Sequence, residues 1–559
     1  GSSGTASAGS NAIVYGSRLP VPENVIKGPI WEYLQKTANV TVDYQVYNDD
    51  QMALVLASGD LPDILEINQR HLPNIVQNNL ALNLDTILDQ HLPFVKHPLY
   101  KLRNEISRKL LGGANNVLYF IGPGVGPEGG GGLDNSSRGY GVRWDYYKEI
   151  GAPPINNNDD YIAAIKAMAA KHPTTPDGRK MMGIGVEKSF TNFFALGFIT
   201  NGLDPWVMMN SQYMADMETN EIHNGFTDIN RSAYWSDMKL YYKLNQAGLF
   251  DTESFSMTLD QYNAKLESES YVAMPIPNTT MYNALRKKDP NTLAAFTVVP
   301  STGTAVYTDA PHQFGSAPDN TIFLSSKSKK WEAAARFLNE MHNPDFLRTL
   351  YSGFKGKDWD YDSGGKPYIM ESIVQARSQG GDIWDKLGIH LGWSNIFMSE
   401  ETAVHPDGYY MSLFMDPEFR AKGLGRSPFE KDYCEFYGVS YHAEATQKLV
   451  DAGKTYSFNK DFVQPIAAGL SDAPMDITRI VQNLNSILER AVPRLITAAN
   501  DAAFQAEQNR VLEELKAAGE PKAWEWVRTT YNKNRPLMDP IIREYNTTYF
   551  DSIRATYKK

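Results

Sequence analysis

The sequence predicts an α/β fold with more than one lobe, and three observations support this prediction. Residues 40–46 alternate apolar and polar side chains, which is the two-residue period of a half-buried strand. A helix is expected next, ending at Gly59, and Pro62 fixes a turn into a buried apolar strand at Ile64–Ile67, which completes a βαβ unit. At 559 residues, the chain exceeds what one hydrophobic core normally supports.

The composition is that of an ordinary globular protein, with 42% hydrophobic and 21% charged residues. The net charge of -11 keeps the chain soluble and disfavours nucleic acid or an anionic membrane surface as its main partner, because phosphate binding needs basic patches. Cys434 is the only cysteine, which excludes an intrachain disulfide and a cysteine-based zinc site. We expect it to be a packed core residue rather than a nucleophile.

Other elements follow from local patterns in the first part of the chain. A short strand is expected at Ile13–Tyr15, and a helix begins at Pro29, where proline is accepted in the first turn. A further strand, Val117–Ile121, leads into the glycine-rich run Gly122–Gly132. This run lacks the spacing of a dinucleotide-binding fingerprint and the Lys-Ser/Thr pair of a P-loop. We interpret it as a surface loop, with a flap over a ligand cleft as the alternative.

The second half of the chain continues with strands and then with helices. Strands are expected at Tyr140–Trp144 and Tyr271–Ile276. The apolar positions of residues 477–496 keep helical spacing, with Asp476 as the expected N-cap and a kink at Pro493. These late helices are expected to complete or brace a second lobe.

Three segments resemble motifs of a known family. They are LASGDLPDI at residues 56–64, Val142–Gly151, and Leu324–Ala334. In this order, over residues 12 to about 360, they resemble the extracellular solute-binding protein family 1, the carbohydrate-binding lipoproteins that feed ABC importers. The resemblance implies a two-lobed, periplasmic-binding-protein-like α/β fold with discontinuous lobes, a hinge and extra C-terminal helices.

The resemblance also implies where the two lobes begin and end in the sequence. Residues 12–139 and about 312–370 are expected to form lobe 1, and residues 140–311 and about 371–559 are expected to form lobe 2 with the C-terminal helices. Residues 1–11 are expected to be a flexible tether, because the chain begins with only Gly, Ser, Thr and Ala. The family's tether follows a lipidated cysteine, which implies an extracellular lipoprotein anchored to a bacterial membrane; a cloning remnant of the same composition is the alternative.

Polar residues stand at the ends of two predicted strands, where ligands collect in open α/β sheets. They are Tyr15, Ser17 and Arg18 around the end of the first strand, and Glu66, Asn68 and Gln69 at the end of the next. We predict that this edge of the sheet faces a ligand.

Aromatic residues are abundant, with 10 Trp, 31 Tyr and 24 Phe. A sugar site is typically an aromatic platform flanked by hydrogen-bonding side chains, because sugar rings have apolar faces and polar edges. Trp144, Trp206 and Trp393 stand beside turn or polar residues and are candidate platforms, with a core position as the alternative for each. Trp residues in helical patterns are assigned to packing: Trp31, Trp331 and Trp524.

We therefore predict a ligand site between the lobes. Its candidate residues are Tyr15, Ser17, Arg18, Asn68, Gln69, Arg143, Trp144, Trp206, Asn278 and Trp393. Arg18 or Arg143 is expected to pair with a uronate carboxylate or to hold sugar hydroxyls.

No catalytic residue, metal or cofactor is predicted. The sequence contains neither H-E-x-x-H nor G-x-S-x-G. Some members of the resembled family carry a calcium loop after the first helix of the second lobe, and here only Asp177 and Gly178 remain of its pattern. A hard cation needs six or more oxygens, so no calcium is expected at this loop.

The predicted function is that of a monomeric receptor that closes on an oligosaccharide by hinge motion and presents it to an ABC transporter permease. Two alternatives stay open. One is a glycoside-active enzyme, since paired carboxylates converge only in space. The other is a receptor of the same fold for a peptide or another solute.

Overall fold

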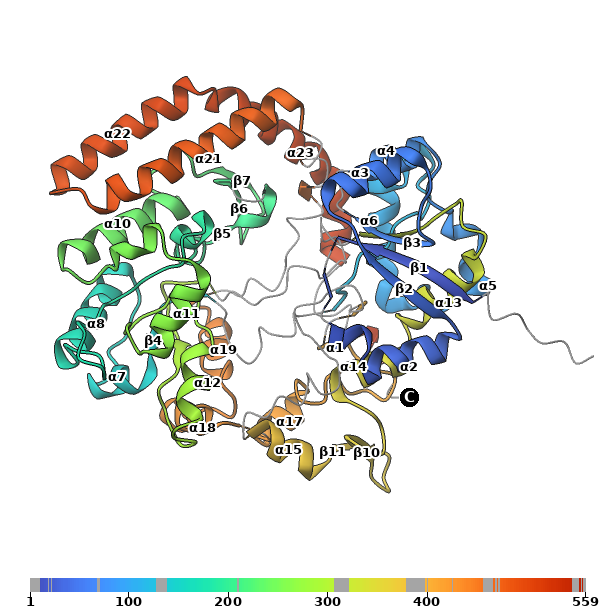
Figure 1. The fold of residues 1–559 in the computed structure, drawn as a ribbon, viewed down its shortest axis with the longest axis horizontal. Coiled ribbons are helices and arrows are strands. Elements are labelled where there is room, and N and C mark those ends of the chain that lie inside the picture. The colour runs from blue at the N-terminus through green and yellow to red at the C-terminus, as the bar shows by residue number, and fades with distance from the viewer. Residues whose placement is uncertain are drawn as a thin grey trace, which may run out of the picture.

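A computed structural model of the chain describes residues 11–18, 20–21, 23–67, 71–126, 138–208, 211–305, 321–378, 398–399, 401–424, 426–455, 466–467, 470, 473–544, 552–553 and 555. Its described helices and strands form two lobes on opposite sides of the molecule, with further helices above and below them (Figure 1). None of the described helices has the length and the apolar character needed to cross a membrane.

The first lobe is built on a four-stranded sheet with the order β2-β1-β3-β9. The strands are β1 (Ala12–Ser17), β2 (Thr41–Val46), β3 (Ile64–Ile67) and β9 (Thr321–Leu324). β1 runs parallel to both β2 and β3, whereas β9 is antiparallel to β3. The predicted βαβ unit is confirmed, because α3 (Asp49–Ser58) joins β2 to β3 and ends at Gly59, whose φ is 71°.

Helices surround this sheet. They are α1 (Glu23–Ile26), α2 (Pro29–Ala38), α4 (Leu72–Gln77), α5 (Leu88–His91), α6 (Lys101–Leu111), α13 (Trp331–Glu340) and α14 (Pro344–Ser352), with short 3-10 turns at Leu84–Thr86, Pro98–Tyr100 and Gly113–Asn115. The start of α2 at Pro29 is confirmed.

Successive residues of the sheet point to opposite faces, and each face has its own apolar core. Tyr15 and Ile64 belong to the core that includes the buried residues of α2 and α13. Leu65 and Phe323 belong to a second core with Met52 of α3. The sheet is therefore covered on both faces, as expected for parallel strands with buried side chains.

The second lobe contains two small sheets. One pairs β4 (Gly141–Arg143) with β8 (Phe296–Val298), and the other has the order β5-β6-β7 with strands Leu203–Asp204, Tyr213–Asp216 and Ile222–Asn224. Its helices are α7 (Trp144–Glu149), α8 (Asn158–Lys171), α9 (Gly197–Asn201), α10 (Ala233–Gln246), α11 (Leu259–Glu267), α12 (Thr280–Arg286), α18 (Pro428–Tyr437) and α19 (Glu444–Asp451), with 3-10 turns at Phe190–Phe194, Pro205–Val207 and Thr252–Phe255.

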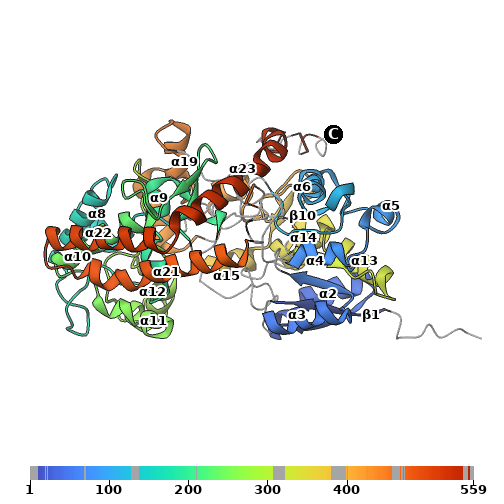
Figure 2. The ribbon, with the colours of Figure 1, turned by 90° about the horizontal axis from the view of Figure 1, so that it is seen from above.

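The C-terminal helices extend this lobe. α21 (Met475–Ile496) packs against α10 and against α22 (Asp501–Ala517). The last long helix, α23 (Glu520–Glu544), contacts β7 in the second lobe and α6 in the first. Figures 1 and 2 show α23 running between the two lobes, which agrees with these contacts.

A smaller unit lies below the first lobe in Figure 1. It consists of the hairpin β10 (Trp359–Tyr361) and β11 (Pro367–Ile369) with α15 (Glu371–Ser378) and α17 (Pro417–Ala421).

A buried ion pair joins α14 to this unit. The guanidinium of Arg348 donates to both carboxylate oxygens of Asp407 at 2.8 and 2.9 Å. Tyr361 also donates to Asp407 at 2.8 Å. Although burial raises it, hydrogen bonding from His405 and the charge of Arg348 hold the pKa of Asp407 well below its ordinary value.

Three features of the structure differ from what the sequence predicts. Val117–Ile121 forms no continuous strand. Ile121 makes one bridge to Ile322, Leu118 accepts one backbone hydrogen bond from Leu84, and Pro123 has no amide with which to extend the bridge. Tyr271–Ile276 pairs through isolated bridges rather than as a continuous strand, because its bridges go to two different segments, from Tyr271 to Met182 and from Ala273 to Val142. Pro474, rather than Asp476, occupies the N-cap of α21.

Replacing Arg348 by methionine is expected to leave the Asp407 carboxylate buried without its cation. We expect Arg348→Met to lower the free energy of unfolding by roughly 3–5 kcal/mol, measured by urea denaturation. The control is Lys27→Met, which removes the exposed ion pair with Glu23 and should change the free energy of unfolding far less. Equal effects of the two substitutions would contradict this assignment.

Candidate functional site

The chain connections show which edge of the first-lobe sheet faces the second lobe. The chain leaves the first lobe after Gly126 and returns to it at Thr321. Ile67 at the carboxyl end of β3 pairs with Thr321, so this end of β3 lies where the chain re-enters the lobe. β1 is parallel to β3, and its carboxyl end at Ser17 therefore lies at the same edge.

The hydrogen bonds around β4 show at which edge of the second lobe the chain enters. Gly139, near the point of entry, donates its amide to Pro275 at 3.2 Å, and Val299, which follows β8, donates to Tyr140 at 3.2 Å. The chain therefore enters the second lobe at the Gly139 end of β4, with Val299 beside this entry. The last described residue before the chain returns is Ala305, whose amide donates to Ile199 at 3.2 Å. Asn278 follows Pro275 by three residues and belongs to this end.

Three first-lobe residues, Ser17, Arg18 and Glu66, form a cluster at the connecting edge. Tyr15 and Ser17 alternate on one face of β1, and the register of β1 with β3 places Ser17 beside Glu66. The Ser17 hydroxyl donates to Glu66 Oε2 at 2.9 Å, and both residues are fully buried. Arg18, half-buried, follows directly after β1.

Glu66 is a neutral acid near pH 7. Burial raises the pKa of its carboxyl to about 8, against opposing effects of the Ser17 hydrogen bond, the Arg18 charge and the Tyr15 hydrogen bond. A protonated carboxyl can donate a hydrogen bond as well as accept one. Glu66 was not among the candidates for the ligand site, although its place at the polar end of a strand was the available signal.

Tyr15 lies beneath this edge rather than on it. Its ring is buried and stacks on Tyr44 with the ring centroids 5.4 Å apart. The structure therefore places Tyr15 in the core that supports Ser17 and Glu66.

On the second-lobe edge, Arg138 and Asn278 are two polar residues close to the point where the chain enters the lobe. Asn278 is half-buried, and its Oδ1 accepts a hydrogen bond at 3.0 Å from the amide of Thr280, the first residue of α12. The guanidinium of Arg138 lies over the ring of Phe198, 5.4 Å from its centroid.

Arg143 lies at the other end of β4. Its amide pairs with Val272, whereas Gly141 pairs with Met274, so Arg143 and Asn278 stand at opposite ends of the same pairing. The guanidinium is buried against Asp145 and Glu269, with a distance of 2.7 Å to Glu269 Oε2. Arg143 is therefore held in an ion pair away from Asn278, and its place in the ligand site stays a prediction.

Trp144 is a packing residue. Its side chain is fully buried, and its indole Nε1 donates to Asp432 of α18 at 2.7 Å. Aromatic rings of α18 surround it: Phe429, Tyr433, Phe436 and Tyr437. The expectation of an exposed platform at Trp144 is therefore wrong, because a helix almost 300 residues away in sequence covers the ring.

Other candidates fall outside what the structure describes. Asn68, Gln69 and Trp393 are outside the described residues, as is the side chain of Trp206 in the turn Pro205–Val207. The tether up to residue 10 and residues 127–132 of the glycine-rich run are also outside them. These assignments stay predictions.

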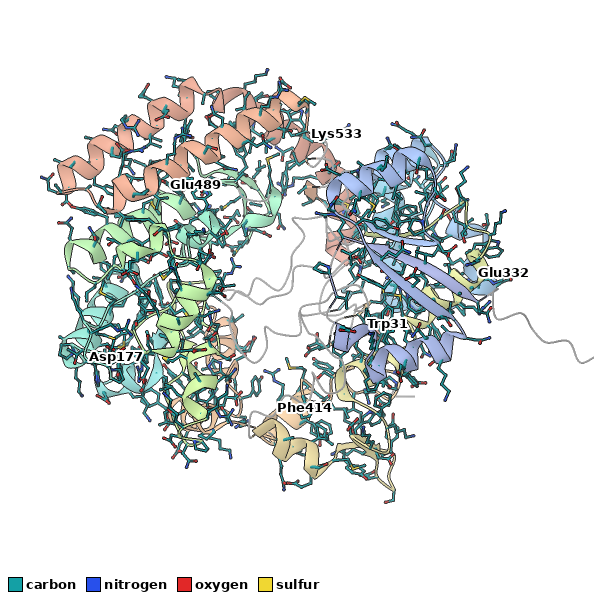
Figure 3. The ribbon with its side chains drawn as sticks, in the orientation of Figure 1. Trp31, Asp177, Glu332, Phe414, Glu489 and Lys533 are labelled. Carbon is teal, nitrogen blue, oxygen red and sulfur yellow. The ribbon has the colours of Figure 1, made fainter. Side chains whose placement is uncertain are left out.

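The structure shows what holds the loop at Asp177. Hydrogen bonds from Arg179 and Thr175 lower the pKa of Asp177 to about 2. Figure 3 shows Asp177 at the outer margin of the second lobe, away from the first lobe. Among the described residues, no group of three or more His, Cys, Asp or Glu side chains is arranged to hold a metal ion.

Comparisons with known proteins bear on the fold. No protein-family model and no curated protein sequence matches this chain. Solved structures do match it over almost its whole length. A solute-binding protein described as HMO binding and ABC-transporter associated, from Bifidobacterium longum infantis, has a TM-score of 0.60 at 13% identity, with 94% of this chain and 99% of that chain covered.

Two further structures give the same result. The S. pneumoniae ABC-transporter substrate binding protein FusA, in complex with kestose, has a TM-score of 0.60 at 15% identity and covers 94% of this chain and 99% of its own. The alginate-binding protein AlgQ2 has a TM-score of 0.56 at 15% identity and covers 93% and 98%. The chain thus has the two-lobed, periplasmic-binding-protein-like α/β fold of ABC-transporter solute-binding proteins, which confirms the predicted fold.

Glu66→Gln is expected to change how stability depends on pH. In the folded protein the pKa of Glu66 is about 8, above its ordinary value of 4.5, so the folded state holds a proton that the unfolded state has released between these pH values. Stability contributed by this group is therefore present below pH 4.5 and lost as pH rises towards 8.

We expect the variant, whose amide resembles the neutral acid, to lose less stability than the wild type between pH 5 and 8, by on the order of 3 kcal/mol. Denaturation at both pH values measures the difference. Burial also raises the pKa of Asp237 to about 8. This residue is present in both proteins, so its contribution to the pH dependence of stability is the same in both. Identical pH dependence in the two proteins would contradict a neutral Glu66.

Proposed function

We propose that the protein is the extracellular substrate-binding component of an ABC importer, which captures an oligosaccharide between its lobes and delivers it to a membrane permease. The observation that carries the proposal is the presence of polar groups on both lobes near the passage of the chain between them, with Arg18 next to Ser17 and Glu66 on the first lobe and Asn278 on the second. The fold supports it, because neighbours with this fold are described as binding human milk oligosaccharides, kestose or alginate.

The proposed ligand contacts come from both edges. Arg18, with the buried pair Ser17 and Glu66 next to it, supplies hydrogen-bond donors from the first lobe, and Asn278 supplies an amide from the second. A ligand that touches both edges makes all its contacts only when the lobes are closed, so its differential affinity shifts the population towards the closed form. Tyr15 supports this edge from below, and we keep Asn68, Gln69, Trp206 and Trp393 as further candidates.

We also propose the lobe boundaries and the setting of the protein. Residues 12–139 with about 312–370 form lobe 1, and residues 140–311 with about 371–559 form lobe 2. The proposed receptor is a monomer on the cell surface, held by a lipid anchor at the tether.

The proposed receptor returns its ligand unchanged. The structural neighbours are named as binding proteins, not as enzymes, which favours capture over catalysis. Recovery of an intact oligosaccharide after incubation with the protein supports a receptor, and a shortened oligosaccharide supports a glycoside-active enzyme.

A bound oligosaccharide is expected to stabilise the protein. Ligand at 100 times its dissociation constant should add about 2.7 kcal/mol to the free energy of unfolding. A thermal-shift screen with human milk, fructan, alginate and plant oligosaccharides should give a shift with one glycan class, with peptides as controls. A response to peptides alone would instead support a receptor for another solute.

Substitution of the edge residues is expected to weaken the binding of the glycan that this screen identifies. We expect Arg18→Met and Asn278→Ala each to raise the dissociation constant by roughly tenfold or more, because each removes hydrogen bonds that exist only in the closed form. Asp177→Asn, at the outer margin of the second lobe, is the control and should leave affinity unchanged. Unaltered calorimetric affinity in both edge variants would argue against a site between the lobes.

A further inference from the structure

Helix α3 of the first lobe presents apolar side chains to solvent. Its inner side is formed by Met52 and Leu56, which are buried in the second core of this lobe. On its outer side Ala53, Leu54 and Ala57 are exposed, and Leu54 is 69% exposed. The outer side of a surface helix normally carries charged and polar residues. An apolar outer side therefore indicates a surface that another molecule covers.

The second lobe has an exposed leucine as well. Leu259 is the first residue of α11 and is 59% exposed, although leucine is among the residues most often buried. Tyr262 and Leu266 hold α11 in the lobe, where they belong to a separate apolar core. The packing of α11 therefore does not account for a leucine at position 259.

The two helices lie on the same face of the molecule. Figure 2 shows α3 at the lower margin of the first lobe and α11 at the lower margin of the second lobe. Each lobe thus contributes one helix with an exposed leucine to this face, which we call the α3–α11 face.

Carboxylates border the exposed leucines. Asp50 stands one helical turn before Leu54, and Asp60 follows the end of α3; both are exposed. Asp260 of α11 is exposed in the same way. No lysine, arginine or histidine occurs in residues 37–69, the stretch of chain that contains α3. The α3–α11 face therefore combines apolar groups with an acidic border.

This chemistry selects among the possible occupants of the face. An anionic membrane surface would bring negative charge against the carboxylates, and so would the same face of a second copy. An apolar protein surface bordered by Lys or Arg would be complementary to both features. In the proposed function, the partner that the protein must contact is a membrane permease.

We propose that the α3–α11 face docks on the permease, with apolar groups of the permease against Leu54 and Leu259 and basic groups beside the carboxylates. This inference rests on the proposed function and deepens it, because it names the surface through which the two proteins recognise each other. The two helices belong to different lobes, so closure changes the distance between them. A permease that contacts both helices at once can therefore distinguish the closed, ligand-bound form from the open one.

ATP hydrolysis by the permease complex tests this proposal. The complex encoded beside the gene of this protein is reconstituted in nanodiscs of neutral lipid, with the human milk, fructan, alginate and plant oligosaccharides of the thermal-shift screen present. We expect the wild type to stimulate hydrolysis. Leu54→Asp and Leu259→Asp should each raise the concentration that gives half-maximal stimulation by about tenfold or more, because a carboxylate would enter an apolar contact.

The acidic border adds a dependence on salt. An increase in ionic strength from about 0.1 M to about 1 M shortens the Debye length from about 10 Å to about 3 Å. We expect the wild type to need a higher concentration for half-maximal stimulation at the higher ionic strength. Stimulation that does not depend on salt would overturn the assignment of basic groups to the partner.

Met475→Asp is the matched control. Met475 is 71% exposed and begins α21, which runs along the top of the molecule in Figure 1, away from α11. This substitution should leave stimulation unaltered, and all three variants should keep the thermal shift that the glycan gives to the wild type.

The remaining outcomes separate this inference from the proposed function. Stimulation that survives both leucine substitutions, or that only one of them weakens, overturns the α3–α11 face and leaves the importer role standing. A wild type that does not stimulate hydrolysis overturns both. A wild-type dimer in analytical ultracentrifugation that both substitutions dissociate would assign the face to a second copy instead.

Discussion

The pairing of β9 with β3 is the interaction on which the architecture depends. Residues 321–324 return from the second lobe and complete the first-lobe sheet beside residues 64–67. All eight of these residues are buried, so their backbone groups need partners, which the ladder provides. Because one strand of the first sheet arrives only after the second lobe has been made, the two lobes are linked by more than one segment and share one defined edge.

Local sequence signals determined much of the first lobe. Gly59, Pro29 and the alternation in residues 40–46 each act within a few residues of themselves, so their consequences could be predicted and were confirmed. Val117–Ile121 and Tyr271–Ile276 have equally apolar patterns, but whether they pair as strands depends on distant neighbours. That information is not contained in a local window.

The arrangement of the candidate site also depends on contacts between residues that are distant in the sequence. Ser17 and Glu66 meet because two strands that are far apart in sequence have a particular register, and only the structure gives this register. Trp144 stands beside polar residues in the sequence, which suggested exposure, but α18 covers it. Arg143 and Asn278 were both plausible candidates in the sequence, but the backbone pairing of β4 places them towards opposite ends of that strand. The sequence shows which residue types stand at these positions, but it does not show which of them lie close together in the fold.

Helix α23 limits how the two lobes can move. It holds the second lobe through Tyr531, whose hydroxyl donates to Asn220 at 2.9 Å, and reaches the first lobe through Glu544, which pairs with Lys101 at 2.5 Å. Pro536 and Pro540 lie between the two contacts and lack amide donors, so the stretch of α23 that joins the lobes has fewer backbone hydrogen bonds than the rest of the helix.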